Sequence, residues 1–420
     1  VHVKLTLDKL MKKTIKPFVL FLSVIVSSIC STAGRAAQDT AEPQAGKIII
    51  LAIDGGGIKG VIPATFIQHI ESSLKKLSYQ LFDVIGGTST GGIISAALTT
   101  PRKTTGHPYT AEDIVNIYSH DGGKIFLAQD CKVEQCATYY ADNGNGGGVE
   151  PYMQKMYGPD VSLVSSHNKM QSLAGNRVKH MFTTSYIVNN SQNKVSKPVR
   201  GDNFGPYLFN WFDAANSPAT DNYYVWEAAR GTSAAPTYFP IANVGGKTPL
   251  RSAAANKWVV DGGTMSNNPA TWGVTEALRT GMASRLEDII VISLGTGIYE
   301  GGAGVGINSN AVTGIVPVDG NWSTTPWMIE KLDDLEGADH SRGVLMSIVL
   351  DAVQTVTNSQ LTALKQAGLK YYRLEPELTY TQSHMDNIHP RNIQSLIATA
   401  NAYIEGEGAE TFKAILNELQ

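Results

Sequence analysis

A serine flanked by glycines is the clearest candidate for covalent chemistry in this chain. Residues 87–91 read GTSTG, a G-x-S-x-G pattern centred on Ser89, between the apolar segment LFDVIGG and an Ile- and Ala-rich segment that starts near Thr90. Between a strand and a helix, this pattern is typical of a nucleophile elbow, in which Gly87 and Gly91 leave room for a strained turn that exposes the serine hydroxyl. The same letters fit an ordinary glycine-rich turn, and the flanking strand and helix favour the elbow.

A second glycine-rich loop could bind either a nucleotide or a transient anion. Residues 54–60 read DGGGIKG, so Gly55, Gly57 and Gly60 match the G-x-G-x-x-G of dinucleotide-binding turns. Such a site expects an acidic residue at the end of the next strand to hold the ribose, and this chain has glycines there. No Gly-Lys-Ser/Thr follows for a P-loop. We therefore predict no nucleotide site.

The same loop suits an oxyanion better. Attack by a serine on an ester creates a negatively charged oxygen, which needs backbone N–H donors in fixed positions. Gly55, Gly56 and Gly57 follow the first predicted strand, and neighbouring parallel strands present their C-terminal loops at one edge of a sheet. We expect this loop to face Ser89 and to supply the oxyanion hole.

A serine hydroxyl also needs a neighbouring base. One candidate is Asp261, 172 residues after Ser89 at the end of the predicted strand KWVVD, although an Asp-Gly pair also serves as a plain turn. A Ser…Asp…His triad would instead require His340, His384 or His389. The elbow follows the first predicted strand by only about 35 residues. The usual α/β-hydrolase places several strands before its nucleophile, so the triad is disfavoured.

A carboxylate base makes a prediction about pH. An aspartate with an ordinary pKa near 4 is a weak base for serine. Burial between packed strands raises the pKa of a carboxyl group and therefore its basicity. We expect activity to be lost on acidification, as Asp261 takes up a proton.

Together these motifs resemble patatin, a lipid acyl hydrolase, and its bacterial patatin-like relatives. Besides the two glycine-rich loops and Asp261-Gly262-Gly263, four segments read like patatin in the same order: FDVIGGTSTGG, TSAAPTYFP (232–240), ISLGTG (292–297) and YYRLEP (371–376). The resemblance is good over residues 47–300 and looser over 340–380. Two positions depart from the pattern: Lys59 stands where arginine is frequent, and Gly263 where alanine is frequent.

The resemblance implies a Ser-Asp dyad without histidine, with Ser89 as nucleophile and Asp261 as general base. The loop formed by Gly55, Gly56, Gly57, Ile58, Lys59 and Gly60 would supply the oxyanion hole, with Lys59 either supporting the loop or meeting a lipid head group. The implied reaction is hydrolysis of acyl esters in phospholipids and galactolipids, during transient contact with a membrane or micelle and without metal or cofactor. Two alternatives remain open: a catalytically silent storage or lipid-binding protein of the same fold, and a triad esterase.

The elements that must position these residues alternate between strand and helix. Strands are predicted at 47–53, 81–87, 180–188, 257–263, 288–297 and 370–378, and helices at 61–77, from Thr90, at 344–366 and at 389–417. Residues 100–175 read as loops and short helices. This alternation predicts a three-layer α/β/α domain with a mainly parallel sheet and a nucleophile elbow. Residues 47–300 form its catalytic part, and 301–420 its C-terminal part, irregular and then helical.

The N-terminal residues indicate a targeting segment. Residues 1–36 have the layout of a bacterial-type secretory signal peptide, with a natural start at Met11, an apolar core over 18–26 and small residues that allow cleavage after Ala33 or Ala36. Residues 37–46 are a polar linker. A secreted or periplasmic location is therefore expected.

Composition excludes nucleic acid as a partner. The 420 residues carry a formal net charge of −3, and removal of residues 1–36, which hold six Lys or Arg and one Asp, leaves −8. An acidic chain without a basic block cannot neutralise phosphates. Cys131 and Cys136, the two cysteines left after such cleavage, could form a disulfide in an oxidising compartment, and their pairing stays open, as does the oligomeric state.

Overall fold

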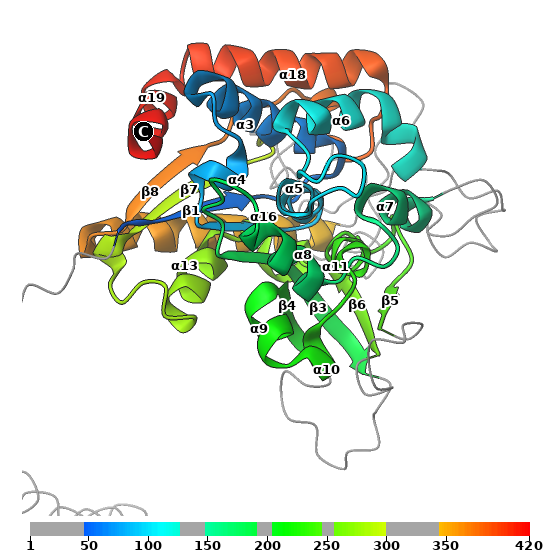
Figure 1. Ribbon diagram of the computed structural model, residues 1–420. Helices are drawn as coiled ribbons and strands as arrows, with labels where there is room; N and C mark the ends of the chain where they lie inside the picture. The colour runs from blue at the N-terminus through cyan, green and yellow to red at the C-terminus, as the bar shows by residue number, and fades with distance from the viewer. Residues whose placement is uncertain (1–45, 127–147, 191–203, 246–255, 300–343) are drawn as a thin grey trace, which may run out of the picture. The chain divides into compact units, whose positions relative to one another are not determined.

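The computed structural model describes residues 46–126, 148–190, 204–245, 256–299 and 344–420 (Figure 1). Its strands form one sheet in the order β5-β6-β3-β2-β1-β7-β8, with β4 pairing with β3. The strand bounds are β1 Ile48–Ile53, β2 Val84–Gly87, β3 His180–Asn190, β4 Gly205–Asn210, β5 Ala242–Val244, β6 Lys257–Asp261, β7 Ile289–Leu294 and β8 Lys370–Leu374. The pairs β3–β2, β2–β1, β1–β7 and β7–β8 are parallel, whereas β4, β5 and β6 enter antiparallel pairs.

Helices cover both faces of this sheet. Their bounds are α3 Val61–Leu74, α4 Ser78–Leu81, α5 Thr90–Thr99, α6 Ala111–Ile125, α7 Val149–Tyr157, α8 Leu163–Gln171, α9 Trp211–Asn216, α10 Pro218–Asp221, α11 Val225–Thr232, α12 Gly263–Ser266, α13 Ala270–Arg279, α16 Val344–Leu364, α17 Tyr380–Ser383, α18 Pro390–Glu405 and α19 Ala409–Leu419, with short 3-10 turns η1 Gly57–Gly60, η3 Leu286–Asp288 and η4 Lys365–Ala367. In Figure 1, α3, α6 and α18 lie together on one side of the sheet and α13 lies on the other.

The first strand shows why both faces need cover. All six residues of β1 are buried, and they alternate between two apolar clusters. Leu51 and Ile53 belong to the cluster that includes side chains of α3, α5 and α18, whereas Ile50 and Ala52 belong to the one that includes α13 and Leu361 of α16. A strand buried on both faces reads as a continuous apolar run, which is the pattern of KIIILAI. The predicted α/β/α layers and the mainly parallel sheet are thereby confirmed.

Strand β3 is the junction that places the site. On one edge it pairs with β4 over Phe182–Ile187, so β2 and β6 must both lie along its other edge. The strand β2 runs parallel to β3 and ends with Gly87 opposite Thr183. The strand β6 runs antiparallel and ends with Asp261 opposite Ser185. The C-terminal ends of β2 and β6 therefore meet head to head along β3, with one residue of β3 between them.

Several predicted elements differ in detail. The helix predicted at 61–77 ends at Leu74, where Lys75 takes a left-handed conformation with φ 51°. The single helix predicted at 389–417 is two helices, α18 and α19, that break at Gly406. The sequence reading also missed the strands β4 and β5 and the helices α11 and α13. Within 100–175, α6 is a helix of 15 residues rather than a short one.

Some predictions concern residues outside the described ranges. These are the signal peptide at 1–36, most of the linker at 37–46, the cysteines Cys131 and Cys136, and His340. Residues 46–420 group into one compact unit. In the part of the chain that the structure describes, no helix combines the length and the apolar character needed to span a bilayer.

Candidate functional site

Ser89 occupies a strained turn between β2 and α5. Its backbone angles are φ 53° and ψ −122°, a conformation that residues with a Cβ rarely adopt. Such strain persists only where the surroundings impose it, and it concentrates at functional sites. The side chain is half-buried at the N-terminal end of α5. A strained turn of this kind between a strand and a helix is what a nucleophile elbow requires.

The two glycines of the elbow are required by close packing. A Cβ on Gly87 would clash with the backbone of Gly91, and a Cβ on Gly91 would clash with the carbonyl of Ile53 at the end of β1. The turn therefore packs directly against its own helix and against the neighbouring strand. The G-x-S-x-G spacing has here a steric cause, because any larger residue would push Ser89 out of its turn.

Asp261 lies at the end of β6 and is 4% exposed. Its Oδ1 accepts the N–H of Gly263 at 2.7 Å, and its carboxyl group lies close enough to Ser89 for that side chain to lower its pKa. Burial raises the pKa of Asp261 to about 6, although Ser89, the Gly263 N–H and the charge of buried Arg230 each lower it. The carboxylate is thus more basic than an exposed aspartate, and the serine side chain lies near it.

Thr232 at the end of α11 links the serine and the aspartate. Its hydroxyl oxygen accepts the N–H of Ser89 at 2.9 Å, and its carbonyl accepts the N–H of Gly262 at 3.3 Å. Asp261 itself donates its N–H to the carbonyl of Ala234 at 3.0 Å. Thr232 and Ala234, at and just after the end of α11, therefore hold the backbone of Ser89 and that of Asp261 and Gly262.

The Asp-Gly sequence at 261–262 is more than a generic turn. A Cβ on Gly262 would clash with the hydroxyl and carbonyl of Thr184, the residue of β3 between the ends of β2 and β6. The Thr184 hydroxyl also lies 2.7 Å from that of Thr88, the residue before Ser89. Because residue 262 is a glycine, the end of β6 can pack directly against Thr184, which places Asp261 near Ser89.

The glycine loop lies against Ser89. A Cβ built on Gly55 would lie 3.2 Å from the Cβ of Ser89. The N–H of Gly55 is already used, because it donates to the carbonyl of Asn267 at 3.1 Å. Among the described residues, the N–H groups of Gly56 and Gly57 have no hydrogen-bond partner. Of the three predicted oxyanion donors, Gly56 and Gly57 are therefore available and Gly55 is not.

The rest of the loop serves other contacts. Gly57 has φ 61°, which favours glycine, and Ile58 donates its N–H to the carbonyl of Met385 at 2.7 Å. The charge of Lys59 lowers the pKa of Asp54, the residue at the start of the loop. A Cβ on Gly60 would clash with the hydroxyl of Thr90, the residue after Ser89.

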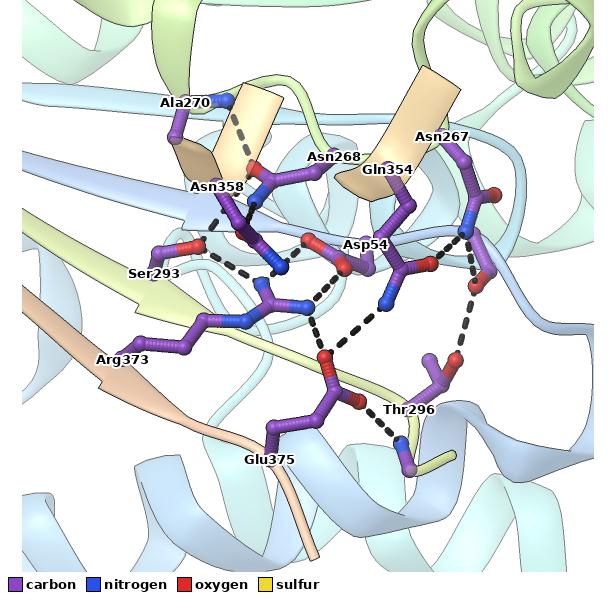
Figure 2. A network of polar contacts seen from close by, with 12 residues as sticks. Asp54, Asn267, Asn268, Ala270, Ser293, Thr296, Gln354, Asn358, Arg373 and Glu375 are labelled. Atoms are coloured by element: carbon purple, nitrogen blue, oxygen red, sulfur yellow. Dashed lines mark hydrogen bonds and ion pairs between the residues drawn. The ribbon is translucent and has the colours of Figure 1, made fainter. Parts of the chain in front are cut away.

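Asp54 at the start of the loop is buried in an ion pair. Nη1 of Arg373 donates to its Oδ1 at 2.9 Å and Nη2 to its Oδ2 at 2.5 Å, a bidentate arrangement seen in Figure 2. Burial raises the pKa of Asp54, and the Arg373 charge opposes that shift. Burial alone lowers the pKa of Arg373, but the Asp54 and Glu375 charges outweigh it, so the net shift is upward.

The described histidines lie elsewhere. Among the described residues, the side chains that interact with Ser89 are those of Thr232, which accepts its N–H, and Asp261, whose pKa it lowers, and neither is a histidine. The ring of His384 packs edge-on against Tyr380 at 4.9 Å, and Nδ1 of His389 accepts the N–H of Arg391 at the start of α18. Within those same ranges, no cluster of three His, Cys, Asp or Glu side chains could hold a metal.

Sequence reasoning missed four residues that build this site: Arg230, Thr232, Thr296 and Arg373. Three of them lie in the segments TSAAPTYFP, ISLGTG and YYRLEP, which the sequence marked only as family-like. The available signal was their place in these family-like segments. Their roles depend on contacts between strands that the sequence alone does not pair.

The chain is similar in sequence to known proteins. The family model for patatin-like phospholipase matches residues 51–271, which include Ser89 and Asp261. Patatin-T5 from Solanum tuberosum is 25% identical over 407 residues, covering 91% of this chain and 88% of that protein. Patatin-like protein 2 from Arabidopsis thaliana is 29% identical over 270 residues, covering 60% of each chain. With more than half of its residues matched by the family model, the chain belongs to the patatin-like phospholipase family.

Proposed function

We propose that this chain is a lipid acyl hydrolase that cleaves carboxylic esters through an acyl-enzyme on Ser89. The observation that carries the proposal is the placement of the buried Asp261 carboxyl group close enough to Ser89 for that side chain to lower its pKa, beside the available N–H groups of Gly56 and Gly57. A nucleophile, a base and oxyanion donors are the three parts that ester cleavage requires.

The steps follow from these positions. Asp261 takes the hydroxyl proton as Ser89 Oγ attacks the ester carbonyl carbon, and Gly56 and Gly57 donate hydrogen bonds to the resulting oxyanion. The carbon–oxygen bond to the alcohol then breaks, and Asp261 returns the proton to the leaving alkoxide. In the second half, Asp261 takes a proton from water, the hydroxide attacks the acyl-serine, and the carboxylic acid leaves as Ser89 regains its proton.

The substrate class follows from family membership. The matching family is named for phospholipase activity, so we propose acyl esters of membrane or micellar lipids as substrates, met in transient contact with the lipid surface. We also propose that the mature protein is secreted or periplasmic, because residues 1–36 have the layout of a signal peptide. A catalytically silent relative that only stores or binds lipid is the alternative that the first experiment below separates.

An activity-based probe tests the proposal directly. The purified full chain should react with a fluorophosphonate, and peptide mass analysis should place the adduct on Ser89, because only an activated serine attacks phosphorus at a useful rate. The same preparation should release fatty acid from phosphatidylcholine vesicles or galactolipid micelles. A folded protein that neither takes the label nor hydrolyses p-nitrophenyl esters would support the silent alternative.

The pH dependence of kcat/KM should show the ionisation of the general base. Asp261 must be ionised to accept a proton, and burial raises its pKa to about 6. We therefore expect kcat/KM for a p-nitrophenyl ester to be level above pH 7, to reach half its maximum near pH 6 and to fall about tenfold per pH unit below that. Measurements at each pH should be paired with circular dichroism to confirm that the chain stays folded.

A change of solvent distinguishes the dyad from a histidine triad, because a histidine also titrates near pH 6 to 7. A less polar medium disfavours the charged form, so it raises the pKa of a carboxyl group and lowers that of an imidazole. In added dimethyl sulfoxide the acid limb of the profile should move to higher pH if Asp261 is the base. Movement to lower pH would instead favour His340, His384 or His389.

A further inference from the structure

The peptide between Gly55 and Gly56 is held from one side by polar groups of two other segments. The Gly55 carbonyl accepts a hydrogen bond from the Thr296 hydroxyl at 2.8 Å and a longer one from the Asn267 side-chain amide at 3.4 Å. Thr296, in the turn after β7, is 4% exposed, so water does not compete freely for this bond. Its side chain also lies where a Cβ on Gly56 would stand.

This arrangement fixes the direction of a proposed catalytic donor. In a trans peptide the carbonyl and the following N–H point in opposite directions within one plane. Anchoring the Gly55 carbonyl on Thr296 and Asn267 therefore turns the Gly56 N–H away from both residues, leaving it available for an oxyanion. We propose that Thr296 is a positioning residue that fixes the Gly55–Gly56 peptide plane and thereby aims the Gly56 N–H, an inference that rests on the hydrolase function proposed above.

The turn that contains Thr296 is hydrogen-bonded to the end of β8 and to Glu375, the residue after it. Gly297 donates its N–H to Oε1 of Glu375 at 2.7 Å, and Gly295 donates to the carbonyl of Leu374 at 2.8 Å. Glu375 in turn pairs with Arg373, which holds Asp54, the residue before Gly55 (Figure 2). The turn and the glycine loop are thus anchored to the same arginine–glutamate pair.

The second anchor of the Gly55 carbonyl belongs to the same network. The side-chain amide of Asn267 donates to Oε1 of Gln354 at 2.9 Å, and Gln354 donates to Oε2 of Glu375 at 3.0 Å. Asn267 follows α12, the helix directly after Asp261 and Gly262. Glu375 therefore supports both groups that hold the peptide, one through Gly297 and one through Gln354.

The experiment compares two substitutions at one position. Thr296→Val removes the hydroxyl at nearly constant shape, whereas Thr296→Ser keeps it. We expect Thr296→Val to lower kcat for a p-nitrophenyl ester roughly 10- to 100-fold with little change in KM, since a misdirected oxyanion donor weakens only the transition state. The rate of fluorophosphonate labelling should fall in parallel, because the phosphonyl oxygen occupies the same donors. Thr296→Ser should restore most of both rates.

Two further measurements separate positioning from general stability. Thr275→Val makes the same chemical change at an exposed position of α13 and should leave kcat unaltered. In a cycle with Glu375→Gln, the two losses in kcat should be less than additive if both residues act through the same peptide. Additive losses would overturn the proposal, as would a Thr296→Val protein with a lower Tm and an unchanged kcat. An inactive, unlabelled wild type would reject the hydrolase function itself, whereas an active wild type with an equally active valine variant rejects only the positioning role.

Discussion

Replacement of Ser89 by alanine is expected to abolish ester hydrolysis, lowering kcat/KM for p-nitrophenyl esters by roughly 10⁴-fold or more. Without the hydroxyl no acyl-enzyme can form, although Asp261 and the N–H groups of Gly56 and Gly57 remain. The fluorophosphonate adduct should disappear with the activity. Fatty-acid release from phosphatidylcholine vesicles should fall to the rate measured without protein.

Folding has to be separated from chemistry in this variant. Alanine meets the same backbone strain as serine at φ 53°, so Ser89→Ala should keep its fold and show a Tm close to that of the wild type. Ser73→Ala makes the same change at an exposed position of α3 and should behave as the wild type in every assay. Retention of a tenth or more of the activity by a folded Ser89→Ala protein would exclude Ser89 as the nucleophile.

Asp261→Asn should lower kcat by roughly 10² to 10⁴-fold, the usual contribution of a general base. The asparagine side chain has almost the shape of aspartate, and its oxygen can still accept the Gly263 N–H. The lost function is proton acceptance, so the acid limb of the pH profile near pH 6 should vanish from the residual activity. Rates over the range pH 5 to 9 would show this.

The stability of this variant makes a second, independent check. The pKa of Asp261 is raised on folding, so its ionised form opposes folding at pH values above about 6, and the neutral amide removes that cost. The Tm of Asp261→Asn at pH 8 should equal or exceed that of the wild type. Asp160→Asn, on the surface beside Lys103, controls for loss of a carboxylate, and His384→Ala and His389→Ala should keep wild-type turnover. A strong loss in either histidine variant would point to a triad.

Much of the site could be predicted because its local sequence is sterically constrained. The continuous apolar run of β1, the glycines around Ser89 and the Asp-Gly after β6 each have one dominant local explanation, and the structure supplies it in the close contacts of Gly87, Gly91 and Gly262. Local pattern therefore located a strand before each glycine-rich motif, although the strands predicted at 257–263, 288–297 and 370–378 are too long, since β6, β7 and β8 end at Asp261, Leu294 and Leu374. The family resemblance then joined the motifs into one candidate site.

Pairing between distant strands could not be read in this way. The sequence of β6 indicated a strand but not its direction. The strand runs antiparallel to β3, and its register on β3 brings Asp261 near Ser89. The same limit applies to the polar network. The segment YYRLEP does not indicate that Arg373 pairs with Asp54, which lies 319 residues earlier in the chain. That pair depends on the order of β1, β7 and β8 in the sheet.

The head-to-head meeting of β2 and β6 has a consequence for how the chain acquires activity during folding. The strands β2 and β6 are far apart in the sequence, and each is positioned by its register on β3. The long segment between β2 and β6 must close before both strands can pair with β3. Forming such long-range pairs is among the slow steps of folding. Newly made chains should therefore gain helical signal early and gain a reactive serine only when the last long-range pairing is complete.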